Sequence, residues 1–151
     1  MRTCEVAVLV TVSEGKRQAD AVSVIQAFCD LMDKGDPEAL RPFFTADAVY
    51  QNCGMPATIG VDAIVAVMAA GMADFADGTY VMKNIAADGD VVLTERVDMI
   101  RTPNGVQGMP VMGTFVLEGG RIRRWHDYFD SSVYRKLMRG EDVSALIPVD
   151  Y

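Results

Sequence analysis

The spacing of apolar residues divides this chain into a helical first half and a strand-rich second half. Apolar positions over residues 14–34 recur every three or four residues, which is typical of a helix with one buried face. Gly35 is expected to end this helix. Asp36 and Pro37 then predict a short helix to about residue 43, because aspartate caps helix N-termini and proline suits the first turn.

After these helices the pattern changes. A short strand is expected over residues 48–52, a loop over 54–60 and a third helix over 61–75. From Thr79 onward the apolar period is two, which predicts strands over 80–86, 91–101, 106–117 and 121–129. Turn residues separate these strands, namely Asp88-Gly89, Pro103-Asn104-Gly105 and Glu118-Gly119-Gly120. A last short helix is expected over 131–139.

Helices followed by meandering strands indicate an α+β fold, with the helices covering one face of a curved, mostly antiparallel sheet. A sheet bent around helices can enclose a pocket that opens at one end. We expect one domain over residues 1–151. The apolar run Ala7–Val12 is short, so residues 1–15 are interpreted as an N-terminal arm or edge strand, and residues 140–151 as a C-terminal tail.

Composition excludes several classes of partner. The net charge of −7 argues against nucleic acid, which is bound by basic surfaces, and no stretch reaches the roughly 18 apolar residues of a membrane span. Cys4, Cys29 and Cys53 have no metal-ligand spacing and His126 is the single histidine, so no metal is expected. Phosphate-binding and dinucleotide motifs are absent, so no cofactor is expected. The cysteine pattern suits the reducing cytoplasm.

The candidate chemistry lies on two predicted strands. Side chains two apart on a strand share a face, so Arg96 and Asp98 should project together, with Thr94 and Ile100 beside them. The same rule directs Trp125, Asp127 and Phe129 inward, and Arg124, His126 and Tyr128 outward. Two carboxylates that share one arginine can hold one acid protonated and the other ionised near neutral pH.

Each of these residues also has a purely structural interpretation. Arg96 and Asp98 taken alone would more commonly be an exposed pair, and Asp127 could cap a turn. Tyr50 and Asn52, two apart on a strand, could be a buried hydrogen-bonded pair. His126 is expected at the surface, and the ten methionines can be core filler or line an adaptable pocket. The joint occurrence of these motifs favours a functional site.

The motifs Tyr50-Gln51-Asn52, Thr94-Glu95-Arg96-Val97-Asp98 and Trp125-His126-Asp127-Tyr128-Phe129-Asp130 resemble those of the limonene-1,2-epoxide hydrolases, in order and separation. The resemblance extends from about residue 19 to 134. It implies a SnoaL-like, cone-shaped (cystatin-like) α+β fold with a curved mixed sheet around a one-ended apolar pocket. His126 and the segment 53–55 depart from the family pattern, which affects the pocket shape more than the chemistry.

The resemblance implies a role for each polar residue. Asp127 would be the general base that deprotonates water, Tyr50 and Asn52 would position that water, Asp98 would be the general acid, and Arg96 would orient both carboxylates. The expected reaction is one-step hydrolysis of a hydrophobic, cyclic, terpenoid or polyketide-derived epoxide to a vicinal diol, without metal or cofactor. The substrate pocket is expected to be lined by Ile100, Met109, Val111, Phe129 and Tyr134.

Two other functions stay open at this point. A polyketide or polyether cyclase could use the same acid and base for intramolecular attack, although Tyr50 and Asn52 favour the retention of water. A non-catalytic small-molecule-binding domain is the second alternative. The outward strand face, with Val97 and Met99, suggests a homodimer.

Overall fold

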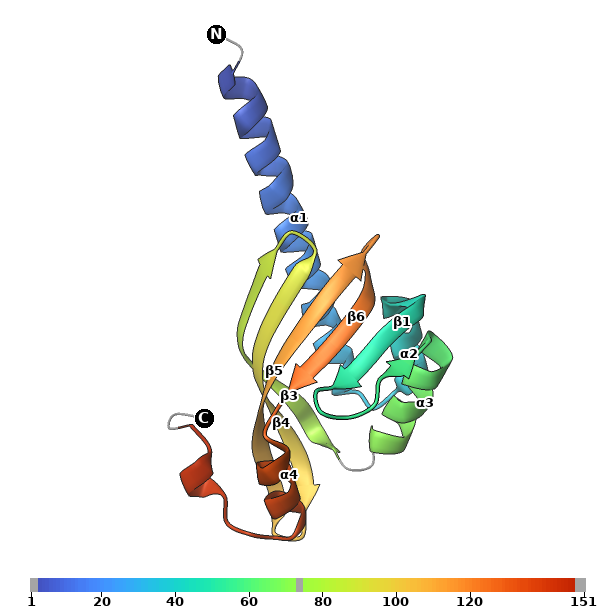
Figure 1. The fold of residues 1–151 in the computed structure, drawn as a ribbon, viewed down its shortest axis with the longest axis vertical. Helices are drawn as coiled ribbons and strands as arrows, with labels where there is room; N and C mark the ends of the chain where they lie inside the picture. Colours follow the sequence, from blue (N-terminus) through green and yellow to red (C-terminus); the bar gives the residue numbers. More distant parts are fainter. Residues whose placement is uncertain (1–2, 73–74, 149–151) are drawn as a thin grey trace.

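Six strands form one curved sheet in the computed structural model, which describes residues 3–72 and 75–148 (Figure 1). The strand order is β2-β1-β6-β5-β4-β3. β1 runs parallel to β6, and the other neighbouring strands are antiparallel. The predicted α+β class with a curved mixed sheet is therefore confirmed.

The first helix is longer than the sequence pattern predicted. α1 spans Thr3–Met32, and its N-terminal part extends past the end of the sheet (Figure 1). The prediction of an edge strand at Ala7–Val12 is wrong, because these residues continue the helix. A short apolar run has no periodicity that separates strand from helix, and no glycine or proline interrupts the chain between this run and Glu14.

The short helical segment after α1 follows the predicted signals. Gly35 has a φ of 68°, and Asp36 Oδ1 then accepts hydrogen bonds from the backbone N–H groups of Glu38 and Ala39 at 3.1 and 3.2 Å. The α-helix α2 (Pro37–Leu40) is followed directly by the 3₁₀ helix η1 (Arg41–Phe43). The cap therefore fixes the point at which the chain turns toward the sheet.

Two predicted boundaries shift in the next segment. β1 (Phe44–Asn52) begins four residues earlier than expected, and β2 (Thr58–Ile59) lies in the predicted loop. α3 spans Val61–Gly71, so the predicted extension of this helix to Phe75 is wrong. Phe75 instead begins β3 (Phe75–Asp88) and pairs with Ile100. Sheet pairing of this kind depends on a distant partner and overrides local helix propensity.

The remaining strands form the predicted meander. β4 spans Val91–Thr102, β5 Gly105–Glu118 and β6 Arg121–Tyr128, with turns where the glycines predicted them. Asp130 then caps α4 (Ser131–Met138), since its Oδ1 accepts a 2.7 Å hydrogen bond from the N–H of Ser132. The 3₁₀ helix η3 (Ser144–Leu146) lies in the predicted tail, the last three residues of which are outside the described chain.

The main core lies between α1 and the inner face of the sheet. Trp125 and Phe28 are fully buried there, with ring centroids 5.2 Å apart in an edge-to-face arrangement. Phe115 stacks on this indole with ring centroids 5.6 Å apart and also contacts the Phe28 ring. A second apolar cluster joins α4 to the ends of β4 and β5 and contains Ile100, Met109, Val111, Val133, Leu137 and Val143. Polar side chains lie between the two clusters.

Val97 and Met99 were expected on an outer face of the sheet that a second copy of the chain could cover. Val97 points outward but is buried within the single chain, at 6% exposure, so it offers little surface to a partner. Exposed apolar side chains on the strands include Val81, Leu93, Met112 and Tyr128. No helix in the described ranges combines the length and apolar character that crossing a bilayer requires.

Candidate active site

One arginine joins two carboxylates on the inner face of the sheet. Arg96 donates from Nε to Asp98 Oδ1 at 2.8 Å and from Nη2 to Asp127 Oδ2 at 2.6 Å. Arg96 is fully buried, and Asp98 and Asp127 are each 4% exposed. The prediction that these three side chains converge is confirmed. The alternative of an exposed Arg96–Asp98 pair is excluded.

The strand register explains how Arg96 reaches a carboxylate two strands away. Thr94, Gly113, Asp127 and Asn52 lie side by side on β4, β5, β6 and β1. A Cβ atom on Gly113 would overlap Arg96 Nη1 and lie 2.6 Å from Thr94 Oγ1. The missing side chain therefore leaves the space in which the guanidinium passes over β5, a typical reason for glycine inside a strand.

Asp127 is oriented by donors from two directions. In addition to the Arg96 contact, its Oδ1 accepts a 2.7 Å hydrogen bond from the buried Trp125 indole Nε1. On the neighbouring strand, the Tyr50 hydroxyl donates to Asn52 Oδ1 at 3.0 Å. A carboxylate oxygen accepts more than one hydrogen bond, so Asp127 retains capacity for a ligand in the adjoining cavity.

Tyr80 completes the surroundings of the arginine. It lies directly opposite Asp98 across the β3–β4 pair, and its ring covers the Arg96 guanidinium with the centroid 4.7 Å from Cζ. The Tyr80 backbone N–H is held by Asp33 Oδ1 at 3.0 Å. A cation that contacts an aromatic face in a desolvated site gains electrostatic attraction, so Tyr80 helps to fix the guanidinium.

Burial and charge separate the proton affinities of these groups. Burial raises the pKa of Asp98 from 3.8 to about 7, against the opposing effect of Arg96 and with a smaller contribution from Asp127. Burial alone would lower the pKa of Arg96, but the charges of Asp127 and Asp98 hold it well above its ordinary value. Asp98 can therefore carry a proton near neutral pH beside a permanently charged guanidinium.

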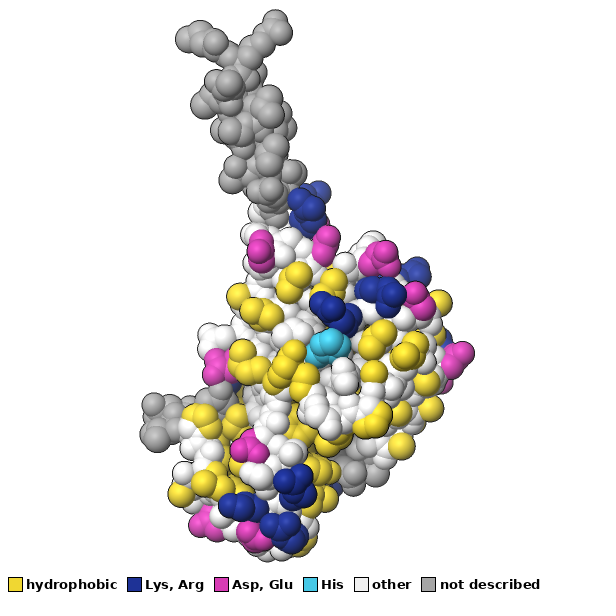
Figure 2. Space-filling view, in the orientation of Figure 1, with side chains coloured by type: hydrophobic (Ala, Val, Ile, Leu, Met, Phe, Trp, Pro, Cys, Tyr) yellow, Lys and Arg dark blue, Asp and Glu magenta, His cyan; other side chains and the backbone are white. Residues whose placement is uncertain are grey.

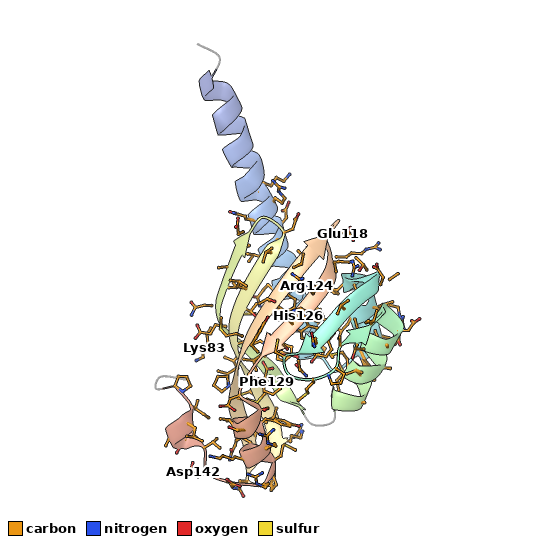
Figure 3. The ribbon with its side chains drawn as sticks, in the orientation of Figure 1. Lys83, Glu118, Arg124, His126, Phe129 and Asp142 are labelled. Carbon is orange, nitrogen blue, oxygen red and sulfur yellow. The ribbon has the colours of Figure 1, made fainter. Side chains whose placement is uncertain are left out.

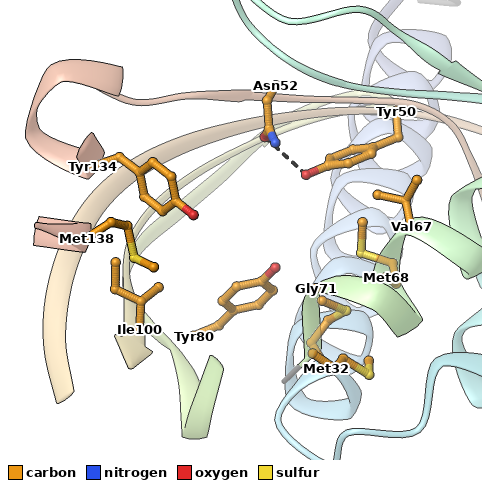
Figure 4. Close-up of a pocket in the computed structure, with 11 residues that line it drawn as sticks. Met32, Tyr50, Asn52, Val67, Met68, Gly71, Tyr80, Ile100, Tyr134 and Met138 are labelled. Carbon is orange, nitrogen blue, oxygen red and sulfur yellow. Dashed lines mark hydrogen bonds between the residues drawn. The ribbon is translucent and has the colours of Figure 1, made fainter. Parts of the chain in front are cut away.

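The polar groups open into two adjoining cavities of about 180 and 190 Å³. Tyr50, Asn52, Tyr80, Ile100 and Tyr134 line both cavities. One cavity also contains both carboxylates and is called the carboxylate lobe. The other, shown in Figure 4, extends between α1, α3 and α4, is lined by Met32, Met68, Met72 and Met138, and is called the methionine lobe.

Four of the five predicted substrate-binding residues contact this pocket. Ile100, Met109, Phe129 and Tyr134 line the carboxylate lobe. Val111 does not line either lobe. It lies on β5 opposite Arg96 of β4, and its side chain packs into the second apolar cluster. Val111 was predicted as part of the apolar wall, but the sequence pattern could not tell which side chains reach the cavity.

The remaining candidate nucleophiles and bases lie elsewhere. His126 is on the outer face of the sheet, visible in Figure 2 and labelled beside Arg124 in Figure 3. Its pKa is lowered, first by burial and then by Arg124. Cys29 is buried in the core, and burial raises its pKa to about 12. Among the described residues, no group of three or more His, Cys, Asp or Glu side chains is arranged to hold a metal ion.

The chain is similar in sequence to known proteins. Residues 25–125 match the SnoaL-like domain. The chain belongs to the SnoaL-like family. It is 32% identical over 126 residues to the epoxide hydrolase EphG of Mycobacterium tuberculosis, and the match covers 82% of this chain and 83% of that protein. The resemblance predicted from the motifs is therefore confirmed.

Solved structures agree with this assignment. The structure of an M. tuberculosis LEH-like epoxide hydrolase aligns with a TM-score of 0.70 at 28% identity, over 82% of this chain and 92% of that one. TerC co-crystallised with polyporic acid aligns with a TM-score of 0.69 at 15% identity, over 80% of this chain and 98% of that one. The second likeness concerns the fold alone.

Three residues of the site were missed in the sequence. Gly113 had a usable signal, since glycine inside a predicted strand often marks a close approach of another group. Trp125 was placed inward, but its hydrogen bond to Asp127 depends on a rotamer that the sequence does not encode. Tyr80 begins a predicted strand. Its position opposite Asp98 depends on how β3 and β4 are paired, and this strand register cannot be read from a single sequence.

Proposed function

We propose that this protein is an epoxide hydrolase that adds water directly to a hydrophobic epoxide and releases a vicinal diol. The observation that carries the proposal is the Arg96 bridge between Asp98 and Asp127 at the wall of a largely apolar pocket. The similarity to EphG supports this reaction class. A carboxylic acid with a raised pKa beside a second carboxylate suits simultaneous donation and removal of a proton.

Each polar residue then has one task. Asp127 removes a proton from a water molecule that Tyr50 and Asn52 help to orient, and the water oxygen attacks one epoxide carbon. Asp98 gives its proton to the epoxide oxygen as that carbon–oxygen bond breaks. Asp98 Oδ2 is the better donor position, because its contact to Arg96 Nη2 is 3.4 Å whereas Oδ1 accepts a 2.8 Å bond from Nε. Arg96 holds both carboxylates in position throughout the reaction.

The size of the expected effect is consistent with this division of work. One well-placed acid or base typically contributes about 10² to 10⁴ in rate. Two acting together therefore correspond to roughly 5 to 11 kcal/mol of barrier reduction. Neither carboxylate alone supplies this range, so both should be indispensable.

Hydrolysis of a panel of cyclic and terpene epoxides tests the proposal. The wild type should form diols, and Asp98→Asn and Asp127→Asn should each lose activity by about 10² or more while remaining folded by circular dichroism. Asp47→Asn is the matched control, because Asp47 pairs with Arg123 on the surface at 3.2 Å. Diol formation that survives in either site variant would contradict the proposal.

The same panel distinguishes hydrolysis from intramolecular cyclisation. Hydroxy-epoxides of suitable length yield a cyclic ether if a substrate hydroxyl attacks, and a triol if water attacks. Tyr50 and Asn52 line both lobes of the pocket and offer polar contacts to water, which favours hydrolysis.

The homodimer stays a prediction that light scattering in dilute solution checks.

A further inference from the structure

Two tyrosine hydroxyls in the pocket have no role in the proposed hydrolysis. In Figure 4 the hydroxyls of Tyr50, Tyr80 and Tyr134 all point into the same space between β3, α4 and β1. The Tyr50 hydroxyl donates to Asn52 Oδ1. Tyr80 and Tyr134 each line both the carboxylate lobe and the methionine lobe.

The phenol groups of Tyr80 and Tyr134 add polar atoms to the pocket wall that a purely hydrocarbon ligand cannot use. A hydroxyl desolvated by a hydrocarbon ligand loses its hydrogen bonds to water, which is unfavourable. A phenol has one donor and two acceptor positions, so it can bind a further oxygen atom even where one position is already used. Burial also raises the pKa of Tyr80 well above its ordinary value, which keeps this hydroxyl a donor.

The charges around the pocket restrict the kind of oxygen. Asp98 and Asp127 are the charged side chains among the described residues that line the two lobes. Arg96 lies behind them, fully buried and occupied by both carboxylates and Thr94. A substrate carboxylate would therefore lose its hydration beside Asp127, whose partner cation is already engaged, whereas a neutral hydroxyl or carbonyl would not carry that cost.

We propose that the substrate is an epoxide that carries a second, neutral oxygen, a hydroxyl or a carbonyl, which is recognised by Tyr80 and Tyr134. The oxirane lies against Asp98 and Asp127, and the remaining hydrocarbon occupies the methionine lobe. This inference rests on the proposed hydrolysis and adds the substrate class to it. Tyr80 and Tyr134 are thereby specificity-determining residues, and the acid and base are unchanged.

Matched substrates test this assignment. Hydrolysis of cyclohexene oxide is compared with that of derivatives that bear a hydroxyl, a keto group or a carboxylate on the ring carbon farthest from the oxirane. The wild type should favour the hydroxyl or keto derivative over the parent by at least about tenfold in kcat/KM, because one satisfied buried hydrogen bond is of this order. The carboxylate derivative should be the poorest substrate.

The variant Tyr80→Phe/Tyr134→Phe should reduce this preference to within about twofold of unity. The preference is a ratio taken within each variant, so a general loss of activity from altered packing cancels. Tyr128→Phe is the matched control, since Tyr128 is 47% exposed and is not among the residues that line either lobe. This control should keep the wild-type preference.

The outcomes separate the inference from the proposed function. Hydrolysis of every derivative without preference, or a preference that survives in the double phenylalanine variant, would overturn the inference and leave the hydrolase intact. If no epoxide is hydrolysed, the proposed function fails, and calorimetric titration with the same compounds still decides the inference. Tighter binding of the hydroxyl or keto derivative would support it, and equal binding would overturn it.

Discussion

Arg96 and Arg123 each contact two carboxylates, yet their surroundings differ. Arg96 is fully buried and holds Asp98 and Asp127 at 2.8 and 2.6 Å. The Arg123 side chain is 39% exposed and lies 3.2 Å from Asp47 and 3.9 Å from Glu118. Water screens the Arg123 pairs and is excluded from the Arg96 pairs, so similar pairings have different consequences for stability.

The largest expected difference is in stability. Arg96→Met leaves two buried carboxylates without their cation and should lower the free energy of unfolding by about 3–5 kcal/mol at neutral pH. Arg123→Met should cost less than about 1 kcal/mol, because exposed pairs contribute little. Urea denaturation of both variants measures the difference. Equal losses of unfolding free energy would show that burial does not determine how strongly the ion pairs of Arg96 stabilise the fold.

The next effect is the pH dependence that Asp98 imposes. The pKa of Asp98 is about 7 in the folded protein, whereas the ordinary value for an aspartate carboxyl is 3.8. Between about pH 4 and 7 the folded state binds the extra proton, so the free energy of unfolding should fall as pH rises, by up to about 1.4 kcal/mol per pH unit. This contribution is fully present at low pH and lost above about pH 7.

Asp98→Asn should remove that slope, whereas Asp47→Asn should retain it. Hydrolysis should also decline about tenfold per unit above roughly pH 7 in the wild type, because the general acid loses its proton. Unfolding and kcat/KM measured across this range check both expectations. A flat rate profile up to pH 9 would exclude Asp98 as the proton donor.

A smaller effect is expected from Gly113→Ala. The new Cβ would meet Arg96 and Thr94, which should destabilise the fold by about 1–3 kcal/mol and reduce hydrolysis, because the guanidinium must shift. Gly15→Ala is the matched control, since Gly15 lies in α1 and a Cβ atom added there would meet no atom within 4 Å. This change should be neutral or stabilising. Thermal unfolding and kcat/KM compare the two.

The smallest effect concerns the surface pair itself. A double-mutant cycle of Arg123→Met and Asp47→Asn should yield a coupling energy of about 0.2–1 kcal/mol that declines with added salt. The corresponding cycle of Arg96→Met and Asp98→Asn should give a larger coupling that salt barely changes. Comparable salt sensitivity in the two cycles would contradict the exclusion of water from Arg96.

The sequence predicted those parts of the fold that depend on local patterns. Alternation on β4 and β6 put Arg96, Asp98 and Asp127 on the inner face, and glycine turns marked the meander. Ala7–Val12 and Phe75 were misassigned because a short apolar run suits both helix and strand, and tertiary pairing decides between them. Tyr80 and Val111 required strand register and cavity shape, which arise only when the sheet closes around α1.

A single turnover in heavy-oxygen water tests the central claim, that the carboxylates bridged by Arg96 add water directly to the epoxide. With enzyme in excess over epoxide, the diol should carry one heavy oxygen after the first turnover, and peptides that contain Asp98 and Asp127 should stay unlabelled by mass spectrometry. An unlabelled first diol, with heavy oxygen retained in either aspartate, would reveal an ester intermediate and contradict the account.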